Sequence, residues 1–313
     1  MEETLYRKIN NGVSRNGALH TRGVHLLNEE GNPVRLRGMS TYGMQWQPQF
    51  AGEGSVRTIR DYGANLLRIA MYTDENGYIA RPAQVKADAF RAVETALALD
   101  MYAVLDWHIL HDNNPQIYKE QAKAFFAEAA QRFAGNPGVL YEICNEPNGE
   151  VTWERDIKPY AEEVISVIRE YAPQALVLVG SSAWSQDVDE AAASPLDFPN
   201  VMYTCHFYAG THGDALRAKI EKALSLGAPI FISEWGTTRA DGNGEIFQKE
   251  SQEWLDFLDS HQLSWANWSL GDKDEGHAAL RPGASPEGNW PESDWSESGR
   301  FVFRRFGTND PVL

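Results

Sequence analysis

The sequence predicts a closed (β/α)8 barrel, in which eight parallel strands are surrounded by helices. Strand-like and helix-like segments alternate through most of the 313 residues. Repeated strand–helix units form a parallel sheet, and eight of them within about 250 residues favour a closed barrel. The alternative is an open doubly wound sheet, which would carry a glycine-rich nucleotide-binding turn after its first strand. Residues 39–46 lack such a turn, so the barrel is favoured.

The expected strands are short apolar runs that are rich in β-branched and aromatic residues and bounded by Gly or Pro. They comprise residues 34–38, 65–70, 102–107, 139–143, 175–180, 201–206, 230–233 and 264–269. The expected helices carry apolar residues at helical spacing. They comprise residues 54–62, 82–99, 118–133, 153–171, 213–226 and 246–260. Gly227 is expected to cap the helix before it, and a short polar connection is expected between the fifth and sixth strands.

The remaining segments are expected to complete a single domain that spans residues 1–313. Residues up to about Pro33 are expected to form a hairpin that closes the barrel floor, with its turn in the Asn- and Gly-containing stretch 28–32. The polar stretch after Gly271 is expected to be a long loop, followed by a final helix at 301–306.

The net charge of −16 argues against several classes of partner. A strongly negative protein repels nucleic acid, anionic lipid and acidic polysaccharide, so we expect neither a nucleic-acid nor a membrane partner. No stretch is long and apolar enough to span a bilayer, and Met1–Thr4 does not begin a signal peptide. The two cysteines, Cys144 and Cys205, each precede a polar residue at a strand end. The pleat turns them toward the outer packing layer, which predicts two buried free thiols and no disulfide.

Two glutamates, Glu146 and Glu234, each follow a short buried run. A carboxylate at the exit of a buried strand is costly unless it is paired, so it calls for a functional reason. In a parallel barrel both would lie at the same rim, where active sites of this fold are found. The commonest chemistry that uses two facing carboxyl groups is the cleavage of glycosidic bonds.

Nearly every expected strand delivers a polar or aromatic side chain to this rim. The set comprises Tyr42, Trp46, Arg68, Tyr72, Asp106, Trp107, His108, Asn145, Glu146, Trp184, His206, Tyr208, Glu234, Trp235, Trp268 and Lys273. Any one of these residues could have a purely structural role. Their occurrence together at nearly every strand end indicates a functional site.

This ordered set resembles glycoside hydrolase family 5, and most closely its bacterial endo-β-1,4-glucanases. The motifs that carry the resemblance are residues 36–40, 67–72, 106–108, 145–147, 206–208, 234–236 and 265–268. The resemblance implies a retaining mechanism with Glu146 as the acid/base and Glu234 as the nucleophile. It also implies a β-glucan substrate and a secreted enzyme, and we expect a monomer with no cofactor and no metal.

The supporting residues have two readings each. Arg68 is the expected cation beside Glu234, or a structural ion pair at the rim. Asn145 is expected to bind a sugar hydroxyl, most reasonably the 2-OH, or to form the turn before Pro147. A retaining pair needs one protonated and one ionised carboxyl at the same pH, which neighbouring charges and burial can produce.

The histidines and Tyr208 are expected to support the glutamates. His108 and His206 are expected to donate hydrogen bonds to substrate or to the carboxyl groups, and Tyr208 resembles the family tyrosine that contacts the nucleophile. His108 and His111 have the spacing of metal ligands. We do not expect a metal there, because His111 lies in a loop and no carboxylate completes the set.

The remaining candidates concern sugar binding. Trp46, Trp184 and Trp268 are expected to stack on sugar rings, although packing competes for Trp268. Lys273 and Glu275 match family positions that bind sugar, but they also read as a solvated charge run. Tyr42 stands where close relatives carry His, which affects fine specificity and leaves the reaction class unchanged.

Other functions use the same features. A mannanase, a xyloglucanase or a mixed-linkage glucanase would keep the same carboxyl pair. A non-catalytic carbohydrate-binding barrel would keep the aromatic residues and lose one glutamate. A metal-dependent hydrolase on the same fold would lose its activity with a chelator.

Overall fold

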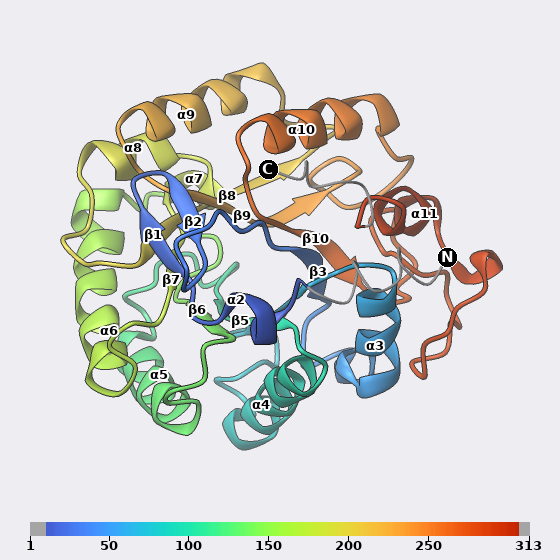
Figure 1. Cartoon of the computed structure of the whole chain (residues 1–313), viewed down its shortest axis with the longest axis horizontal. Helices are drawn as coiled ribbons and strands as arrows, with labels where there is room; N and C mark the ends of the chain where they lie inside the picture. The colour runs from blue at the N-terminus through green and yellow to red at the C-terminus, as the bar shows by residue number, and fades with distance from the viewer. Residues whose placement is uncertain (1–10, 307–313) are drawn as a thin grey trace.

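A computed structural model describes residues 11–306 and confirms the expected barrel (Figure 1). Within this range eight parallel strands close on themselves in the order β10-β3-β4-β5-β6-β7-β8-β9. The barrel strands are β3 (Arg37–Thr41), β4 (Leu66–Tyr72), β5 (Tyr102–His108), β6 (Val139–Glu142), β7 (Val177–Val179), β8 (Val201–Tyr208), β9 (Ile230–Gly236) and β10 (Trp265–Leu270).

The longer helices form a ring around these strands (Figure 1). The helices of the described residues are α2 (Val13–Asn16), α3 (Glu53–Asp61), α4 (Pro82–Ala98), α5 (Lys119–Arg132), α6 (Lys158–Tyr171), α7 (Ser182–Ser185), α8 (Val188–Ala193), α9 (Asp214–Ser225), α10 (Gln248–Ser260) and α11 (Glu297–Phe303). Short helical turns occur at η1 (Pro48–Ala51), η2 (Trp153–Ile157) and η3 (Glu292–Asp294). No helix between residues 11 and 306 combines the length and the apolar character needed to cross a membrane.

Two apolar layers hold the barrel together. Successive strand residues point to opposite sides of a sheet, so each strand contributes to both layers. Leu66, Val104 and Leu140 belong to a cluster inside the barrel. Val139 and Tyr141, one residue away on either side of Leu140, belong to the larger cluster that includes the helix side chains.

The expected N-terminal hairpin is present, but its turn lies elsewhere. Strands β1 (His20–Arg22) and β2 (His25–Leu27) pair antiparallel around Gly23, whose φ is +58°. The predicted turn at 28–32 is a second turn, in which the Asn28 side chain accepts a hydrogen bond from the Asn32 backbone at 2.8 Å. This second turn returns the chain to pair Leu27 with Pro33.

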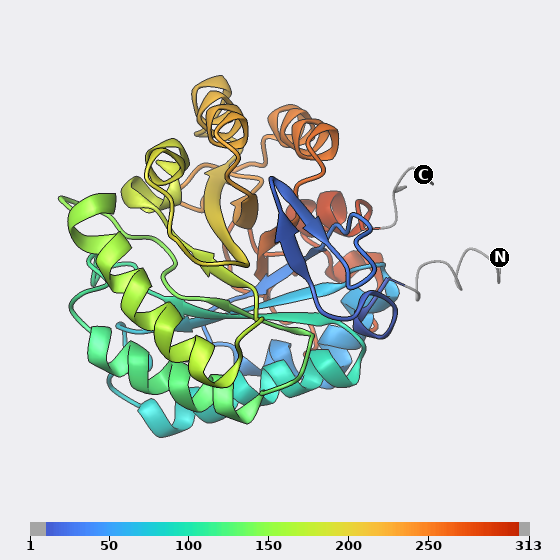
Figure 2. The same ribbon diagram turned by 60° about the vertical axis from the view of Figure 1, so that its left-hand side comes forward.

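The hairpin lies at one end of the barrel (Figure 2). Its Leu26, together with Leu19, packs into the cluster inside the barrel, and the Thr21 backbone N–H donates to Asn200 at 3.1 Å. The hairpin also explains why the first barrel strand begins at Arg37 and not at residue 34. The Val34 backbone N–H donates to the Leu26 carbonyl at 2.9 Å, so Val34 pairs with the hairpin.

Three helical predictions need correction. The single helix expected over 153–171 is a π-helical turn followed by α6, because Pro159 has no N–H to donate to the carbonyl of Arg155. The polar connection expected after the fifth strand contains α7 and α8. The final helix is Glu297–Phe303, four residues earlier than expected, because the Ser296 side chain caps it by accepting from the Gly299 N–H at 2.9 Å.

Two smaller predictions are confirmed. Gly227 follows α9 with a φ of +85°, the left-handed conformation of a helix C-cap. Cys144 and Cys205 are both free and buried. Both belong to the cluster between the strands and the helices, as the pleat predicts.

Candidate active site

Glu146 and Glu234 face a common cleft of about 510 Å³. Glu146 lies in the segment that follows β6, and Glu234 lies within β9. On the β8–β9 pair, Thr204 is opposite Phe231 but His206 is opposite Glu234, so β9 carries one extra residue. Such a bulge changes which side of the sheet a side chain faces. Phe231 points into the barrel, and strict alternation would turn Glu234, three residues later, to the outside. The extra residue brings Glu234 to the inside, where it lines the cleft.

Glu234 is held as an anion. The Arg68 Nη1 donates to its Oε2 at 2.9 Å, and the Tyr208 hydroxyl donates to its Oε1 at 2.7 Å. Burial alone would raise the pKa of Glu234, but the charges of His206 and Arg68 hold it below its ordinary value. Burial and the charge of Glu234 raise the pKa of Tyr208, which therefore stays a hydrogen-bond donor.

The surroundings of Glu146 shift its pKa the other way. Burial, with the nearby charge of Glu234, raises the pKa of Glu146 above its ordinary value, although its contact with His206 opposes this shift. The His206 Nδ1 lies 2.9 Å from Glu146 Oε1. One oxygen of each glutamate and a ring nitrogen of His206 all lie within 4.8 Å of one another. The two carboxyl groups thus lie close together, and their surroundings shift their pKa values in opposite directions.

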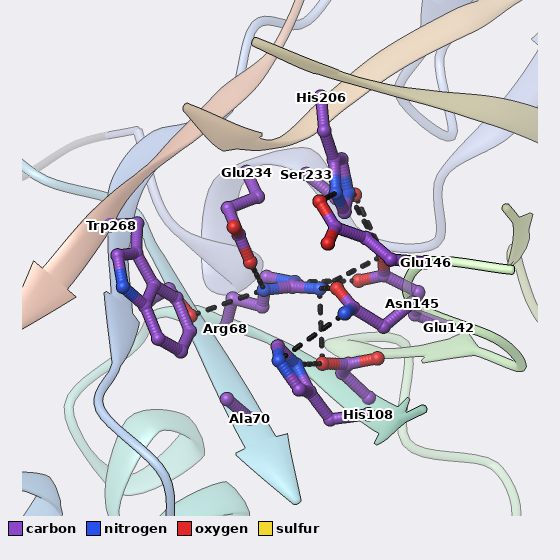
Figure 3. A network of polar contacts seen from close by, with 12 residues as sticks. Arg68, Ala70, His108, Glu142, Asn145, Glu146, His206, Ser233, Glu234 and Trp268 are labelled. Atoms are coloured by element: carbon purple, nitrogen blue, oxygen red, sulfur yellow. Dashed lines mark hydrogen bonds and ion pairs between the residues drawn. The ribbon is translucent and has the colours of Figure 1, made fainter. Parts of the chain in front are cut away.

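Arg68 is the centre of a buried polar network (Figure 3). Besides Glu234, its guanidinium binds Glu142 in bidentate fashion, with Nε–Oε2 at 2.7 Å and Nη2–Oε1 at 3.1 Å. Its Nη2 also donates to Asn145 Oδ1 at 2.6 Å and lies 3.0 Å from Asp106 Oδ2. The two readings of Arg68 therefore describe one side chain, which is at once a structural ion pair and the cation beside Glu234.

Asn145 is anchored on both sides. Its Oδ1 accepts from Arg68, and its Nδ2 donates to the Ile109 carbonyl at 3.0 Å and to His108 Nε2 at 3.2 Å. Burial, with the charge of Arg68, lowers the pKa of His108 to about 3, so this ring is neutral. Its Nδ1–H donates to Asp106 at 2.6 Å, which leaves Nε2 as the acceptor for Asn145. Both hydrogens of the Asn145 amide are therefore used, and the second lone pair of Oδ1 is the position left to accept from a sugar hydroxyl.

A chain of polar contacts lines one wall of the cleft. The Tyr42 hydroxyl accepts from Lys273, which also pairs with Glu275. Glu275 lies 2.9 Å from the Nε2 of His277, and the Trp268 indole N–H donates to that same nitrogen at 3.2 Å. The charges at 273 and 275 are thus tied to the cleft wall through Tyr42 and His277.

The three candidate stacking tryptophans differ in exposure. Trp184 lines the cleft with 47% of its surface exposed. Trp46 is 40% exposed and packs against Tyr42 and Tyr72, which line the cleft themselves. Trp268 is only 4% exposed and stacks on the ring of His108 at a centroid distance of 5.4 Å. Trp184 and Trp46 therefore offer free ring faces, whereas much of Trp268 is used in packing.

Trp184 is presented on a left-handed turn. Ala183, Trp184 and Ser185 have φ values of +53°, +57° and +56°. The Trp184 N–H donates to the Pro147 carbonyl at 3.0 Å, and the Ser185 hydroxyl donates to the Asn145 carbonyl at 2.6 Å. Each such residue costs roughly 1–2 kcal/mol. These contacts join the Trp184 turn to the segment that carries Glu146.

Ala183→Gly is expected to leave the free energy of unfolding unchanged or to raise it by up to about 1 kcal/mol, because glycine relieves the left-handed strain. The matched control is Ala218→Gly, the same change at an exposed position in the right-handed helix α9. It is expected to cost about 1 kcal/mol. Urea denaturation measures both variants, and equal losses of stability would contradict the strain at position 183.

Sequence reasoning missed several residues of the site. Glu142 and Ser233 lie beneath the carboxyl pair, and His277, Gln186, His212 and Asp241 line the cleft. A signal existed for Glu142, because it follows Leu140 at the inward-facing spacing of β6. Gln186 and Asp241 lie in loops, where periodicity gives no signal.

The metal set considered from the sequence does not assemble. His111 is exposed and pairs with Glu75 at 2.7 Å, away from the cleft. Within residues 11–306, the side chains with metal-ligand spacing are Glu146, His206 and Glu234 themselves. The Arg68 guanidinium already places a positive charge 2.9 Å from Glu234, which opposes the binding of a cation at that carboxylate.

A closed (β/α)8 barrel with this carboxyl pair at the carboxyl ends of its strands is the architecture of a glycoside hydrolase. Residues 27–274 match the cellulase family, glycosyl hydrolase family 5. The chain belongs to this family.

Curated relatives and solved structures agree with this assignment. The chain is 50% identical to an endoglucanase of Clostridium saccharobutylicum over 94% of its length, which corresponds to 66% of the relative. It is 55% identical to endoglucanase A of Evansella cellulosilytica over 87% of its length and 56% of the relative. The chain thus spans only somewhat more than half of the length of these relatives. The catalytic domain of the Thermobifida fusca endoglucanase Cel5A is similar, with a TM-score of 0.91, 36% identity, and coverage of 95% of this chain and 99% of that domain.

Proposed function

We propose that the protein is an endo-acting, retaining β-1,4-glucanase that uses Glu234 as the nucleophile and Glu146 as the acid/base. The observation that carries the proposal is the carboxyl pair, with oxygens within 4.8 Å of one another and pKa values shifted in opposite directions. Retaining glycosidases hold their two carboxyl groups about 5–5.5 Å apart, whereas inverting enzymes need about 6.5–9.5 Å to admit a water molecule. The approach of one oxygen of each group to within 4.8 Å fits the shorter, retaining spacing.

In the first step, the Glu234 carboxylate attacks the anomeric carbon while Glu146 gives its proton to the leaving oxygen. The glycosidic bond breaks and a covalent glycosyl–Glu234 intermediate forms. The hydrogen bonds from Arg68 and Tyr208 keep Glu234 ionised and aligned before the attack. They also stabilise its negative charge when it leaves in the next step.

In the second step, the Glu146 carboxylate takes a proton from a water molecule, and the resulting hydroxide attacks the anomeric carbon. Glu234 is released and the sugar keeps its original configuration. The carboxylate formed on Glu146 is stabilised by His206, 2.9 Å away. Each glutamate therefore returns to its starting state.

A neutral glucan chain is the proposed substrate. The net charge of −16 disfavours acidic polysaccharides, and Trp46 and Trp184 offer exposed rings for sugar faces. A variant of the Thermobifida fusca catalytic domain, 36% identical to this chain, has been solved with cellotetraose. We further propose that Lys273, Glu275 and Tyr42 bind sugar hydroxyls, and that the protein is a monomer that acts outside the cell.

The product profile on cellohexaose tests the proposal. Internal cleavage is expected to give cellobiose, cellotriose and cellotetraose early, with the β-anomer formed first. Carboxymethylcellulose, mannan and barley glucan assayed side by side would distinguish the related specificities. Early release of glucose alone, an initial α-anomer, or loss of activity with EDTA would contradict the proposed reaction. Binding without the release of reducing ends would indicate a carbohydrate-binding barrel.

A further inference from the structure

The ring of His277 is buried in the wall of the cleft, between two other residues that line it. Its Nε2 accepts from the indole N–H of Trp268 at 3.2 Å and lies 2.9 Å from Oε2 of Glu275. The ring also packs against Gly242, where a Cβ would collide with it. It therefore contacts β10, the segment after β10 and the loop after β9.

One ring nitrogen cannot serve both Trp268 and Glu275. The indole N–H of Trp268 can only donate, so it needs a free lone pair on Nε2. Burial alone would raise the pKa of Glu275, but its contacts with His277 and Lys273 hold it below its ordinary value. The Glu275 carboxylate is therefore ionised, can only accept, and needs a hydrogen on Nε2. The two contacts exclude one another at any instant.

Neither tautomer of the neutral His277 ring satisfies every buried group. Hydrogen on Nδ1 leaves the lone pair of Nε2 for Trp268, but Nδ1 is buried and has no hydrogen-bond partner among the described residues. Hydrogen on Nε2 serves Glu275 and leaves the Trp268 N–H without this acceptor. An unpaired buried donor is costly. Because each tautomer has one, this penalty does not separate the two.

We propose that His277 is a positioning residue for the glucan, whose ring holds Trp268 in one tautomer and Glu275 in the other. Both side chains line the cleft, so their orientation shapes the surface that meets the sugar. Within residues 11–306, the His277 side chain makes no hydrogen bond or ion pair with Glu146 or Glu234. Its effect therefore falls on binding and not on bond cleavage. The inference rests on the proposed function, because it takes the cleft to bind glucan.

Two variants of His277 test the proposal together. His277→Leu fills much of the space of the ring and holds neither Trp268 nor Glu275. Its KM for cellohexaose is expected to rise about tenfold with kcat within about twofold of the wild type, the pattern of a lost binding contact. His277→Gln carries an acceptor and two donors on one amide, so it can serve both partners at once. Its KM is expected to be no higher than that of the wild type.

His261→Leu is the matched control. It makes the same change after the last turn of α10, before β10 begins and at the end of the barrel opposite the cleft, and is expected to keep the wild-type KM and kcat. A wild-type KM in His277→Leu would overturn the proposal. So would a KM in His277→Gln as high as that of His277→Leu, or a fall in kcat without a change in KM. Should His277→Leu not fold, His277→Met takes its place.

A second measurement does not depend on activity. The indole 1H–15N NMR signal of Trp268, assigned by its absence from Trp268→Phe, reports whether the N–H has an acceptor. His277→Leu and His277→Gln both lack the imidazole ring, so their signals differ through the hydrogen bond. The indole proton is expected farther downfield in His277→Gln, and coincident signals would overturn the inference. If the protein neither binds nor cleaves glucan, the proposed function fails, whereas this signal still decides whether residue 277 holds Trp268.

Discussion

Glu234→Gln is expected to abolish turnover of even activated aryl cellobiosides, whereas Glu146→Gln is expected to spare the first step on the same substrates. Without the Glu234 carboxylate no glycosyl–enzyme bond can form, however good the leaving group is. A good leaving group departs without protonation, so the loss of Glu146 is felt little in that step. On natural glucan, where the leaving oxygen needs the proton, Glu146→Gln is expected to lose about 10²–10⁴-fold in rate.

The two roles separate in a single pre-steady-state experiment. Glu146→Gln is expected to release a burst of the aryl alcohol and then to stall as the glycosyl–Glu234 intermediate, because no base activates water. Intact-protein mass spectrometry detects that intermediate. The control is Glu94→Gln, which neutralises an exposed glutamate on α4 that pairs with Arg132 far from the cleft. Equal loss of the burst in both active-site variants would refute the assignment of roles.

Arg68→Met is expected to lower the free energy of unfolding by about 3–5 kcal/mol, because it leaves buried carboxylates without their cation. The guanidinium pairs with Glu142, Asp106 and Glu234, and none of these side chains has more than marginal exposure. Urea denaturation at fixed pH measures the loss. Arg68→Lys keeps the charge but loses the bidentate fork, so an intermediate loss is expected.

Arg68→Met is also expected to change the pH dependence of activity. Removing the positive charge beside Glu234 raises its pKa, so the ionised nucleophile is lost at a higher pH as the solution is acidified. The acid limb of kcat/KM therefore moves to higher pH.

The control for the stability measurement is Arg91→Met, which breaks an ion pair between Arg91 and Asp88. The side chain of this arginine is 69% exposed. Arg91→Met is expected to cost less than about 1 kcal/mol, and a similar cost for Arg68→Met would contradict the buried network.

The fold was largely predictable because its signals are local. Each barrel strand is a compact apolar run, and the longer helices repeat their apolar residues over several turns. The segment after β7 failed because α8, with six residues, is too short to show a period. The left-handed turn at Ala183–Ser185 is held by contacts with Asn145 and Pro147. Neither alanine nor serine favours that conformation on its own, so no local signal could reveal it.

The rim of the site was predictable, whereas the contacts made by the residues beneath it were not. Rim residues such as Glu146 and His206 follow apolar runs, and the barrel rule places such positions together. Glu142 lies inside a strand and depends on Arg68, 74 residues away in the chain. Ser233 contacts His206 and Glu142, and these contacts form only when β6, β8 and β9 come together. A single sequence shows the polar residues in the strands but does not show which partner neutralises or orients each of them.

The end of the barrel opposite the cleft offers positions through which the protein can be coupled to a surface or a label. At that end, the Asn65 amide donates to the Asn11 carbonyl at 3.2 Å, and Phe306 stacks on Trp265 at the start of β10 with ring centroids 5.5 Å apart. The first and last described residues thus both lie opposite the cleft. A bead, electrode or fluorescent label coupled through either of them would leave the cleft facing the solution, where it stays open to a long polymer.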